Sequence, residues 1–483
     1  MRPLLLAATV ILAAASGARA GPPPGDDDTF SYLEPQESHP ARAAGWIALE
    51  LSLHMADYLL TDRPPGPVYA TVYTPWDKLV HGAISFDSNT FRTNFLGHPF
   101  MGASLYQWAR GSRLPAWTSS LYAVAGSTAW ELIEFQEKAS INDLVVTPVA
   151  GVALGEALFQ MGAHLDRSPP SAVRTVLAWL TAPWKKVNDA IDDATLARGW
   201  PADTLEAHAW SSGGVVDTAE GRRGEARLVG GWRLWRDADY GAPGLATRAW
   251  LDAQATGLEA TLAGGPQGVT DARLQSSALL AALYARSIDA EGLGADLVAG
   301  VGPGFELRGH AWTAASPFDR AGVVEIPRGA LEGRWLAGRT RLTVRLDLAL
   351  VFGGASSFAL DGDPGAAPYD TLPTVQQQHG YHFGLGGSCR AAAELAAGPA
   401  TLAVAWRADS LGVVSNPDPT PGHHPTAVLS ERWNEAVLRA SVRLVGRLVL
   451  GADAGWRRRW GRADATTREA SERSLDLSIG VAE

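Results

Sequence analysis

The sequence predicts an α+β protein of two domains, in which a compact α-helical bundle precedes an antiparallel transmembrane β-barrel of about twelve strands. Three observations predict this fold. Apolar residues recur with a helical period between Ala41 and about Leu165, and from about residue 225 onward they alternate with polar residues. In addition, the 483 residues exceed what one ordinary core accommodates.

The first twenty residues have the features of a secretory signal peptide. Arg2 precedes an apolar run from Leu4 to Ala15, and a small-x-small cleavage signal ends at Ala20. We therefore expect residues 1–20 to be removed after export. Residues 21–40, which begin with a stretch rich in Pro, Gly and Asp, are expected to form a disordered leader.

The composition excludes some classes of partner and site. A net charge of −10 argues against nucleic acid as a partner, because phosphate binding requires clustered Lys and Arg. Cys389 is the only cysteine, so the chain can form neither a disulfide framework nor a cysteine-based metal site. The partner we expect is the lipid of the outer membrane of a Gram-negative bacterium.

The barrel is predicted for residues 204–483, and its clearest strand runs from Arg341 to Phe352, where apolar and polar side chains alternate strictly. A secreted soluble β domain would show the same alternation of side chains. Long and short connections that alternate along the chain, however, are typical of outer-membrane barrels. Tryptophans near the predicted strand ends also favour a membrane: Trp235, Trp312, Trp335, Trp433, Trp456 and Trp460. We expect long connections at 314–328, 353–380, 410–432 and 461–470, and short ones at Gly302–Gly304 and near Gly338, Gly398 and Gly446.

The Gly302–Gly304 turn divides residues 293–313 into two predicted strands, at 293–301 and 304–313. The first predicted strand of the barrel begins near residue 225. The polar face of the strands is expected to line the lumen, where charged side chains either pair or are solvated: Arg341, Arg345, Asp347, Arg407, Arg439 and Arg443.

The helical module is predicted for residues 41–165, with five helices. They lie near 45–60, from about Asp77 into the following apolar run, at 100–110, from Pro115 onward, and after a capping box at Ser140–Asp143. Residues 166–203 form an amphipathic connector, which suits either a membrane surface or the rim of the barrel.

The stretch "NFLGHP" holds Asn94, His98 and Pro99, an Asn-x-x-x-His-Pro motif. With Trp130–Phe159, it resembles the bacterial domain-of-unknown-function family 3943 over residues 76–162. The resemblance implies a domain boundary and a cell-envelope setting. It implies no reaction.

The polar residues of this module form the candidate site. Glu131 and Glu134 share a helix face, and a hairpin of the last two helices would bring Glu134 and Asp143 to the same end, where His98 could approach them. Such a set could bind a metal or perform acid–base catalysis, with His98 as general base. The alternative is that these groups cap helices and fix turns. Five further residues are expected to have motif or structural roles: Asn94, Pro99, His81, Asn142 and Thr147.

Three classes of function are compatible with these features. The favoured one is an outer-membrane barrel protein whose helical domain, periplasmic or plug-like, has a binding or structural role and holds an envelope lipid or glycan. The second is an enzyme that modifies envelope lipid or lipopolysaccharide through the His/carboxylate cluster. The third is a gated transport barrel. The sequence identifies no cofactor and no particular metal.

Overall fold

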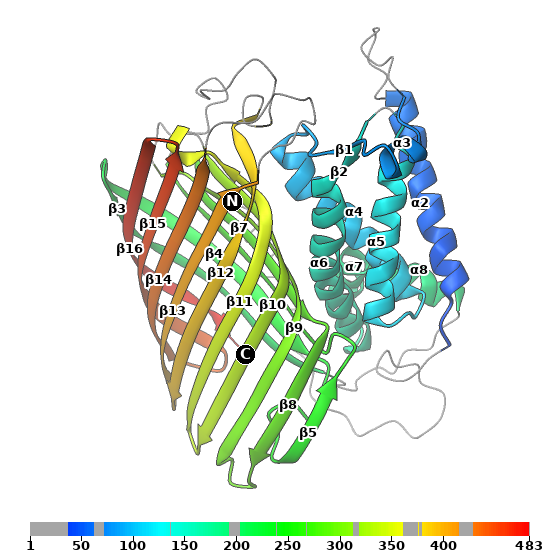
Figure 1. The fold of residues 1–483 in the computed structure, drawn as a ribbon. Coiled ribbons are helices and arrows are strands. Elements are labelled where there is room, and N and C mark those ends of the chain that lie inside the picture. The colour runs from blue at the N-terminus through cyan, green and yellow to red at the C-terminus, as the bar shows by residue number, and fades with distance from the viewer. Residues whose placement is uncertain are drawn as a thin grey trace.

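The computed structural model describes residues 37–61, 72–135, 137–192, 203–237, 239–266, 268–312, 318–360, 375, 379–414 and 428–482. The predicted signal peptide and nearly all of the leader lie outside these residues. Figure 1 shows a β-barrel with a bundle of helices beside it. We call residues 37–192 the helical module.

The helical module contains the predicted helices, with one correction. The helix expected from Asp77 onward is a single short turn, α3, because Gly82 follows with a positive φ of 69°. Ser140 caps the last long helix as expected, since its Oγ accepts the backbone N–H of Asp143 at 3.2 Å. The elements are α2 (Pro40–Thr61), α3 (Pro75–Leu79), β1 (Ile84–Ser85), η2 (Thr93–Gly97), α4 (His98–Gly111), α5 (Ala116–Ile133), β2 (Ala139–Ser140), α6 (Ile141–Arg167), α7 (Ala172–Thr181) and α8 (Pro183–Ile191).

Helices α4 and α6 cross at a pair of glycines. A Cβ atom added to Gly102 would lie 1.8 Å from the carbonyl oxygen of Thr147, and one added to Gly151 would lie 2.4 Å from the carbonyl carbon of Gly102. The two backbones therefore approach more closely than larger residues would permit. This crossing fixes His98, at the start of α4, beside the first turn of α6.

The connector is packed against the rest of the protein. The Trp184 ring stacks on Trp108 with centroids 4.0 Å apart, and the Lys185 ammonium group is buried between Asp166 and Asp189 at 2.7 and 2.5 Å. Lys186 also pairs with Asp166, at 2.9 Å, so both lysines of the connector are held by carboxylates of the protein.

The barrel is a closed ring of twelve antiparallel strands, as predicted. Hydrogen bonds join β16 back to β3, and β5 and β8 extend the sheet at one end beside β9. The strands are β3 (Thr204–Thr218), β4 (Gly221–Trp235), β5 (Gly244–Trp250), β6 (Ala255–Gly265), β7 (Gly268–Leu279), β8 (Ala281–Ile288), β9 (Gly294–His310), β10 (Asp319–Ala337), β11 (Thr340–Ser356), β12 (Tyr381–Ala397), β13 (Ala400–Val413), β14 (Leu429–Arg443), β15 (Leu448–Ala463) and β16 (Thr466–Ala482).

The predicted number of strands was right, although several details of the prediction were wrong. Gly302–Gly304 is no turn but part of β9, where Gly302 pairs with Arg328 and Gly304 with Glu325. Pro303 cannot donate a backbone hydrogen bond, and the partner strand β10 bulges opposite it, between Glu325 and Arg328. The strand β3, which precedes residue 225, was missed. The long connection expected at 461–470 is a tight turn between β15 and β16.

The remaining connections define two ends of the barrel. The longer ones follow β9, β11 and β13, and we call this the long-loop end; the turns near Gly338, Gly398 and Gly446 lie at the opposite, short-turn end. The predicted long connection at 314–328 was too long, because β10 begins at Asp319. Both termini of the barrel, Thr204 and Ala482, lie at the short-turn end.

The barrel has an apolar outer face and a charged interior. Along β11, Leu346, Leu348 and Leu350 are exposed on the outer face, while Arg345 and Asp347 alternate with them and face the lumen. This inside-out arrangement is that of membrane-spanning barrels. The expected tryptophan girdle is incomplete, because Trp235, Trp312 and Trp433 are buried.

The helical module packs against the outer face of the barrel (Figure 1). Phe95 and Val149 pack in one hydrophobic core with Val324 of β10 and Phe352 of β11. Phe352 lies on the same face of β11 as the exposed leucines, and Val324 is its partner on the neighbouring strand. The helices are therefore not a plug inside the barrel. Among the described helices, α6 alone is long and apolar enough to cross a membrane, and most of its apolar window is buried against neighbours.

A candidate metal centre where the helical module meets the barrel

Three side chains that could bind a metal ion converge at the long-loop end of the helical module. They are Asp87, His98 and Asp143, and their ligand atoms lie within 4.8 Å of one another. The Nε2 atom of His98 is 3.5 Å from Oδ1 of Asp143. The carboxylates of Asp87 and Asp143 also lie beside each other. Two adjacent carboxylates with an imidazole form a donor set suited to a divalent cation.

Each of the three residues is placed by a different element. Asp143 lies in the first turn of α6, which Ser140 caps. His98 is the first residue of α4, and Pro99 behind it suits the first turn because a helix start needs no N–H at that position. Asp87 lies in the extended segment after β1, and its backbone N–H donates to Asn142 Oδ1 at 3.1 Å.

Two buried amides orient the carboxylates. Asn94 Nδ2 donates to Asp87 Oδ1 at 2.7 Å and to the Tyr381 hydroxyl at 3.0 Å, and Asn142 Nδ2 donates to Asp143 Oδ1 at 2.9 Å. Tyr381 is the first residue of β12, so the motif residue Asn94 links the site directly to the barrel. Supports of this kind around the ligands are typical of metal centres.

Three buried polar atoms around this cluster lack a hydrogen-bond partner among the described residues. They are His98 Nε2, Asn94 Oδ1 and Thr147 Oγ1. Thr147 is one helical turn beyond Asp143 and so shares its face of α6. A buried polar group without a partner costs about 1–3 kcal/mol. A bound cation with its water ligands would satisfy such atoms.

The other two predicted catalytic residues, Glu131 and Glu134, are not part of the cluster. Glu131 Oε2 accepts the backbone N–H of Ser140 at 2.6 Å, and Lys78 donates to the backbone carbonyls of both Glu131 and Glu134. Burial raises the pKa of Glu131 to about 7 and that of Glu134 to about 8. Burial also lowers the pKa of His98, which favours the neutral imidazole that binds metals.

The structure therefore separates the predicted site residues into two groups. His98 and Asp143 come together with Asn94, Asn142 and Thr147, whereas His81 is exposed and pairs with Asp77 at 3.1 Å, outside the cluster. Asp87 is not among the predicted residues, because the pattern from Asp77 onward predicts a helix and gives no sign of the turn before "NFLGHP". Nothing in the sequence indicates that Tyr381 contacts this site, since 287 residues separate it from Asn94.

The six predicted lumen residues all line two cavities inside the barrel. One cavity, of about 680 Å³, lies toward the short-turn end, and the other, of about 450 Å³, lies deeper. Arg407 pairs with Asp409 at 2.6 Å, and Arg439 with Asp453 at 2.6 Å. The predicted residues in the first cavity are Arg341, Arg345, Asp347, Arg439 and Arg443, and Arg407 lines the second.

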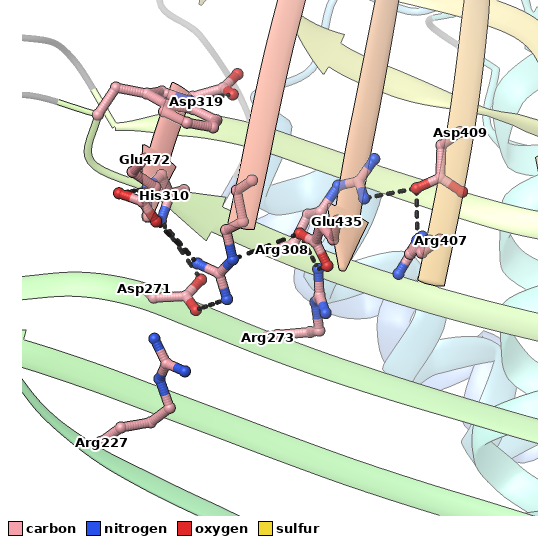
Figure 2. Close-up of polar contacts among 12 residues, drawn as sticks. Arg227, Asp271, Arg273, Arg308, His310, Asp319, Arg407, Asp409, Glu435 and Glu472 are labelled. Carbon is pink, nitrogen blue, oxygen red and sulfur yellow. Dashed lines mark hydrogen bonds and ion pairs between the residues drawn. The ribbon is translucent and has the colours of Figure 1, made fainter. Parts of the chain in front are cut away.

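Ion pairs also cross the lumen between strands that are not neighbours, as Figure 2 shows. Arg273 of β7 contacts Glu435 of β14 at 2.7 Å, and Arg457 of β15 contacts Asp271 at 2.8 Å. These pairs connect opposite walls of the barrel and obstruct the passage between them.

The comparisons with known proteins concern the two parts of the chain separately. Residues 83–184 match the family model described as "Domain of unknown function (DUF3943)", which confirms the resemblance and includes the three candidate ligands. No curated protein matches the chain.

Among solved structures, the chain is similar to OmpT, an outer membrane protein of Vibrio cholerae in its trimer form, at 8% identity over 58% of this chain and 100% of that chain, with a TM-score of 0.20. It is also similar to the translocator domain of the autotransporter NalP from Neisseria meningitidis, at 14% identity over 62% of this chain and 92% of that chain, with a TM-score of 0.22. At these TM-scores the likeness carries no conclusion about function.

Proposed function

We propose that this is an outer-membrane protein whose helical module binds a divalent cation at Asp87, His98 and Asp143, and whose barrel anchors that module in the envelope. The observation that carries the proposal is the buried Nε2 atom of His98, which faces two carboxylates without a hydrogen-bond partner among the described residues. A cation would bind this nitrogen and neutralise the two adjacent carboxylates, which otherwise repel each other when both are ionised. Mixed imidazole and carboxylate ligands suit Zn²⁺ or Mn²⁺.

The exposed surface of both parts supports the outer-membrane placement. The outer face of the barrel exposes leucines, and the helical module also exposes large apolar side chains, among them Leu53, Leu121 and Leu180. Apolar surface on this scale is unusual for a water-soluble protein and typical of contact with lipid. The predicted signal peptide supplies the route of export.

Measuring the metal content of the purified protein tests the proposal. We expect about one equivalent of Zn²⁺ or Mn²⁺ in the wild type by elemental mass spectrometry, as a three-ligand site binds one ion. The variants Asp87→Asn, His98→Gln and Asp143→Asn should lose it while retaining the heat-modifiable migration of a folded barrel. His81→Gln is the matched control, because His81 forms an exposed pair with Asp77 at a similar distance in the same module.

Two results would contradict the proposal. One is a wild-type protein that binds neither ion even after incubation with each and removal of the excess. The other is a folded His98→Gln variant that keeps the full metal content.

A second candidate function is hydrolysis of an envelope lipid, which the same residues favour if the cation activates a water molecule. The bound water would then lie beside Asn94 Oδ1 and Thr147 Oγ1, two buried polar atoms that have no hydrogen-bond partner among the described residues. Mass spectrometry of envelope lipids from cells with wild type, with His98→Gln and without the protein distinguishes this activity from binding alone. A lipid species that requires the wild type at equal barrel abundance would establish an enzyme, and identical profiles would exclude lipid modification.

A further inference from the structure

An apolar groove of about 530 Å³ runs between the helical module and the outer face of the barrel. One wall is formed by β4, β6, β7 and β9, and the other by Phe91, Arg92 and Leu96, which belong to η2 and the turn before it. The groove extends from Phe318 and Arg320 at the long-loop end to Trp232 on the wall of β4. Its barrel wall carries five leucines: Leu228, Leu258, Leu262, Leu274 and Leu307.

The barrel wall of this groove is part of the apolar outer face. Leu258 alternates along β6 with Glu259, which pairs with His208, and Leu274 alternates on β7 with Arg273, which pairs inside the lumen. Small residues, among them Ala260, lie between the leucines and leave the space open. The groove therefore opens toward the lipid that surrounds the barrel in the proposed placement.

Two arginines at this groove differ from those of the lumen. Neither Arg92 nor Arg320 forms an ion pair with any residue that the structure describes, whereas Arg273, Arg407 and Arg457 are all paired. Arg92 is exposed, and the guanidinium of Arg320 lies 5.0 Å from the centre of the Phe91 ring. Arg320 also donates a hydrogen bond to the backbone carbonyl oxygen of His379 at 3.4 Å, which leaves its positive charge without a carboxylate partner among the described residues. Guanidinium groups in this state beside an apolar groove are complementary to a ligand with an anionic head and an acyl tail.

We propose that the groove holds an acyl chain of lipid A and that Arg92 and Arg320 bind its phosphate. The long-loop end of an outer-membrane barrel faces the cell exterior, so the lipid at this level is the phosphorylated glycolipid of the outer leaflet. The inference rests on the outer-membrane placement proposed above and is independent of the cation site.

Native mass spectrometry of the detergent-purified protein, titrated with purified lipid A or with phosphatidylglycerol, tests the inference. We expect lipid A to bind the wild type more tightly than phosphatidylglycerol. The double variant Arg92→Gln/Arg320→Gln should weaken lipid A binding by about tenfold or more, because two charge-assisted contacts are lost. Ala260→Trp should weaken it similarly by filling the groove.

Matched controls separate the groove from the rest of the outer face. Ala454 is an exposed alanine on the outer face of β15, so Ala454→Trp adds the same bulk away from the groove. Arg458→Gln removes an exposed arginine that is paired with Glu469. Both controls should bind lipid A as the wild type does.

Equal lipid A binding by wild type and Ala260→Trp would overturn the proposal, as would phosphatidylglycerol binding as tight as that of lipid A. Cell fractionation of the same strains tests the outer-membrane placement separately, and metal content tests the cation site. Failure of the lipid contact is therefore distinguishable from failure of the proposed function.

Discussion

The guanidinium group of Arg110 lies 3.1 Å from the carboxylate of Asp252, and this ion pair joins the helical module to the wall of the barrel. Arg110 is buried in α4, where it also pairs with Glu156 at 3.0 Å, and Asp252 lies in the break between β5 and β6. Asp252 also accepts the backbone N–H of Ala116, at the start of α5, at 2.5 Å. The connection between β5 and β6 is therefore a docking point for two helices.

Replacement of Arg110 by Met should detach the helical module while leaving the barrel folded. Glu156 is fully buried, so its charge would lose its partner at a cost of about 3–5 kcal/mol. We expect faster hydrogen–deuterium exchange in α4 and α6 with unchanged exchange in β13–β16. Arg113→Met is the control, because Arg113 pairs with Asp192 nearer the surface of the same module. Unchanged exchange in α4 would show that the pair does not hold the module.

Gly151→Ala should destabilise the crossing of α4 and α6. The added methyl group would lie 2.4 Å from the backbone of Gly102, so the helices must separate at a cost of about 1–3 kcal/mol. Gly45→Ala is the matched control, since Gly45 lies within α2 with no atom within 4 Å of the added carbon, and alanine there should be neutral or slightly stabilising. Thermal unfolding followed by tryptophan fluorescence measures both. Equal midpoints for the two variants would contradict the close crossing.

The barrel could be predicted because its physical signal is local. Each strand alternates apolar and polar residues, and the turns at Gly338, Gly398 and Gly446 carry glycines whose φ is positive, as a tight turn demands. The errors arose where local signals conflict with the sheet. Gly302 and Gly304 indicate a turn, but the sheet continues through them because β10 bulges opposite Pro303.

The candidate site could be predicted only in part, because half of it depends on tertiary packing. The motif identified Asn94 and His98, and the capping box identified Asp143. The contact of His98 with Asp143 depends on the glycine crossing of α4 and α6. Asp87 reaches them because β1 pairs with β2 directly before α6, and two-residue strands carry too little pattern to be recognised in a sequence.

Rising pH should weaken the helical module through Glu134, which follows α5 as its cap. Burial raises the pKa of this carboxyl from 4.5 to about 8, so the folded state retains a proton that the unfolded chain releases. The stability it contributes is complete below pH 4.5 and is lost as the pH rises through about 8. In Glu134→Gln the unfolding midpoint should fall less over this range than in the wild type. A parallel pH dependence in both proteins would contradict this assignment, and Glu291→Gln, in an exposed turn, is the control.

Removing the ion pairs that cross the lumen should open the barrel to ions. Arg273 pairs with Glu435, and Arg457 pairs with Asp271, in each case across the lumen. The double variant Arg273→Ser/Arg457→Ser would therefore leave two carboxylates that repel each other and attract water. In planar bilayers we expect a low conductance for the wild type and a several-fold higher, cation-selective conductance for this variant.

Arg458→Ser is the control for this measurement, because its pair with Glu469 is exposed rather than in the lumen. It should conduct as the wild type does. A wild-type conductance as high as that of the double variant would show that the ion pairs across the lumen do not close it. This result would favour a transport function. A low conductance that rises only in the double variant would show that the paired charges close the lumen, as an anchoring role of the barrel requires.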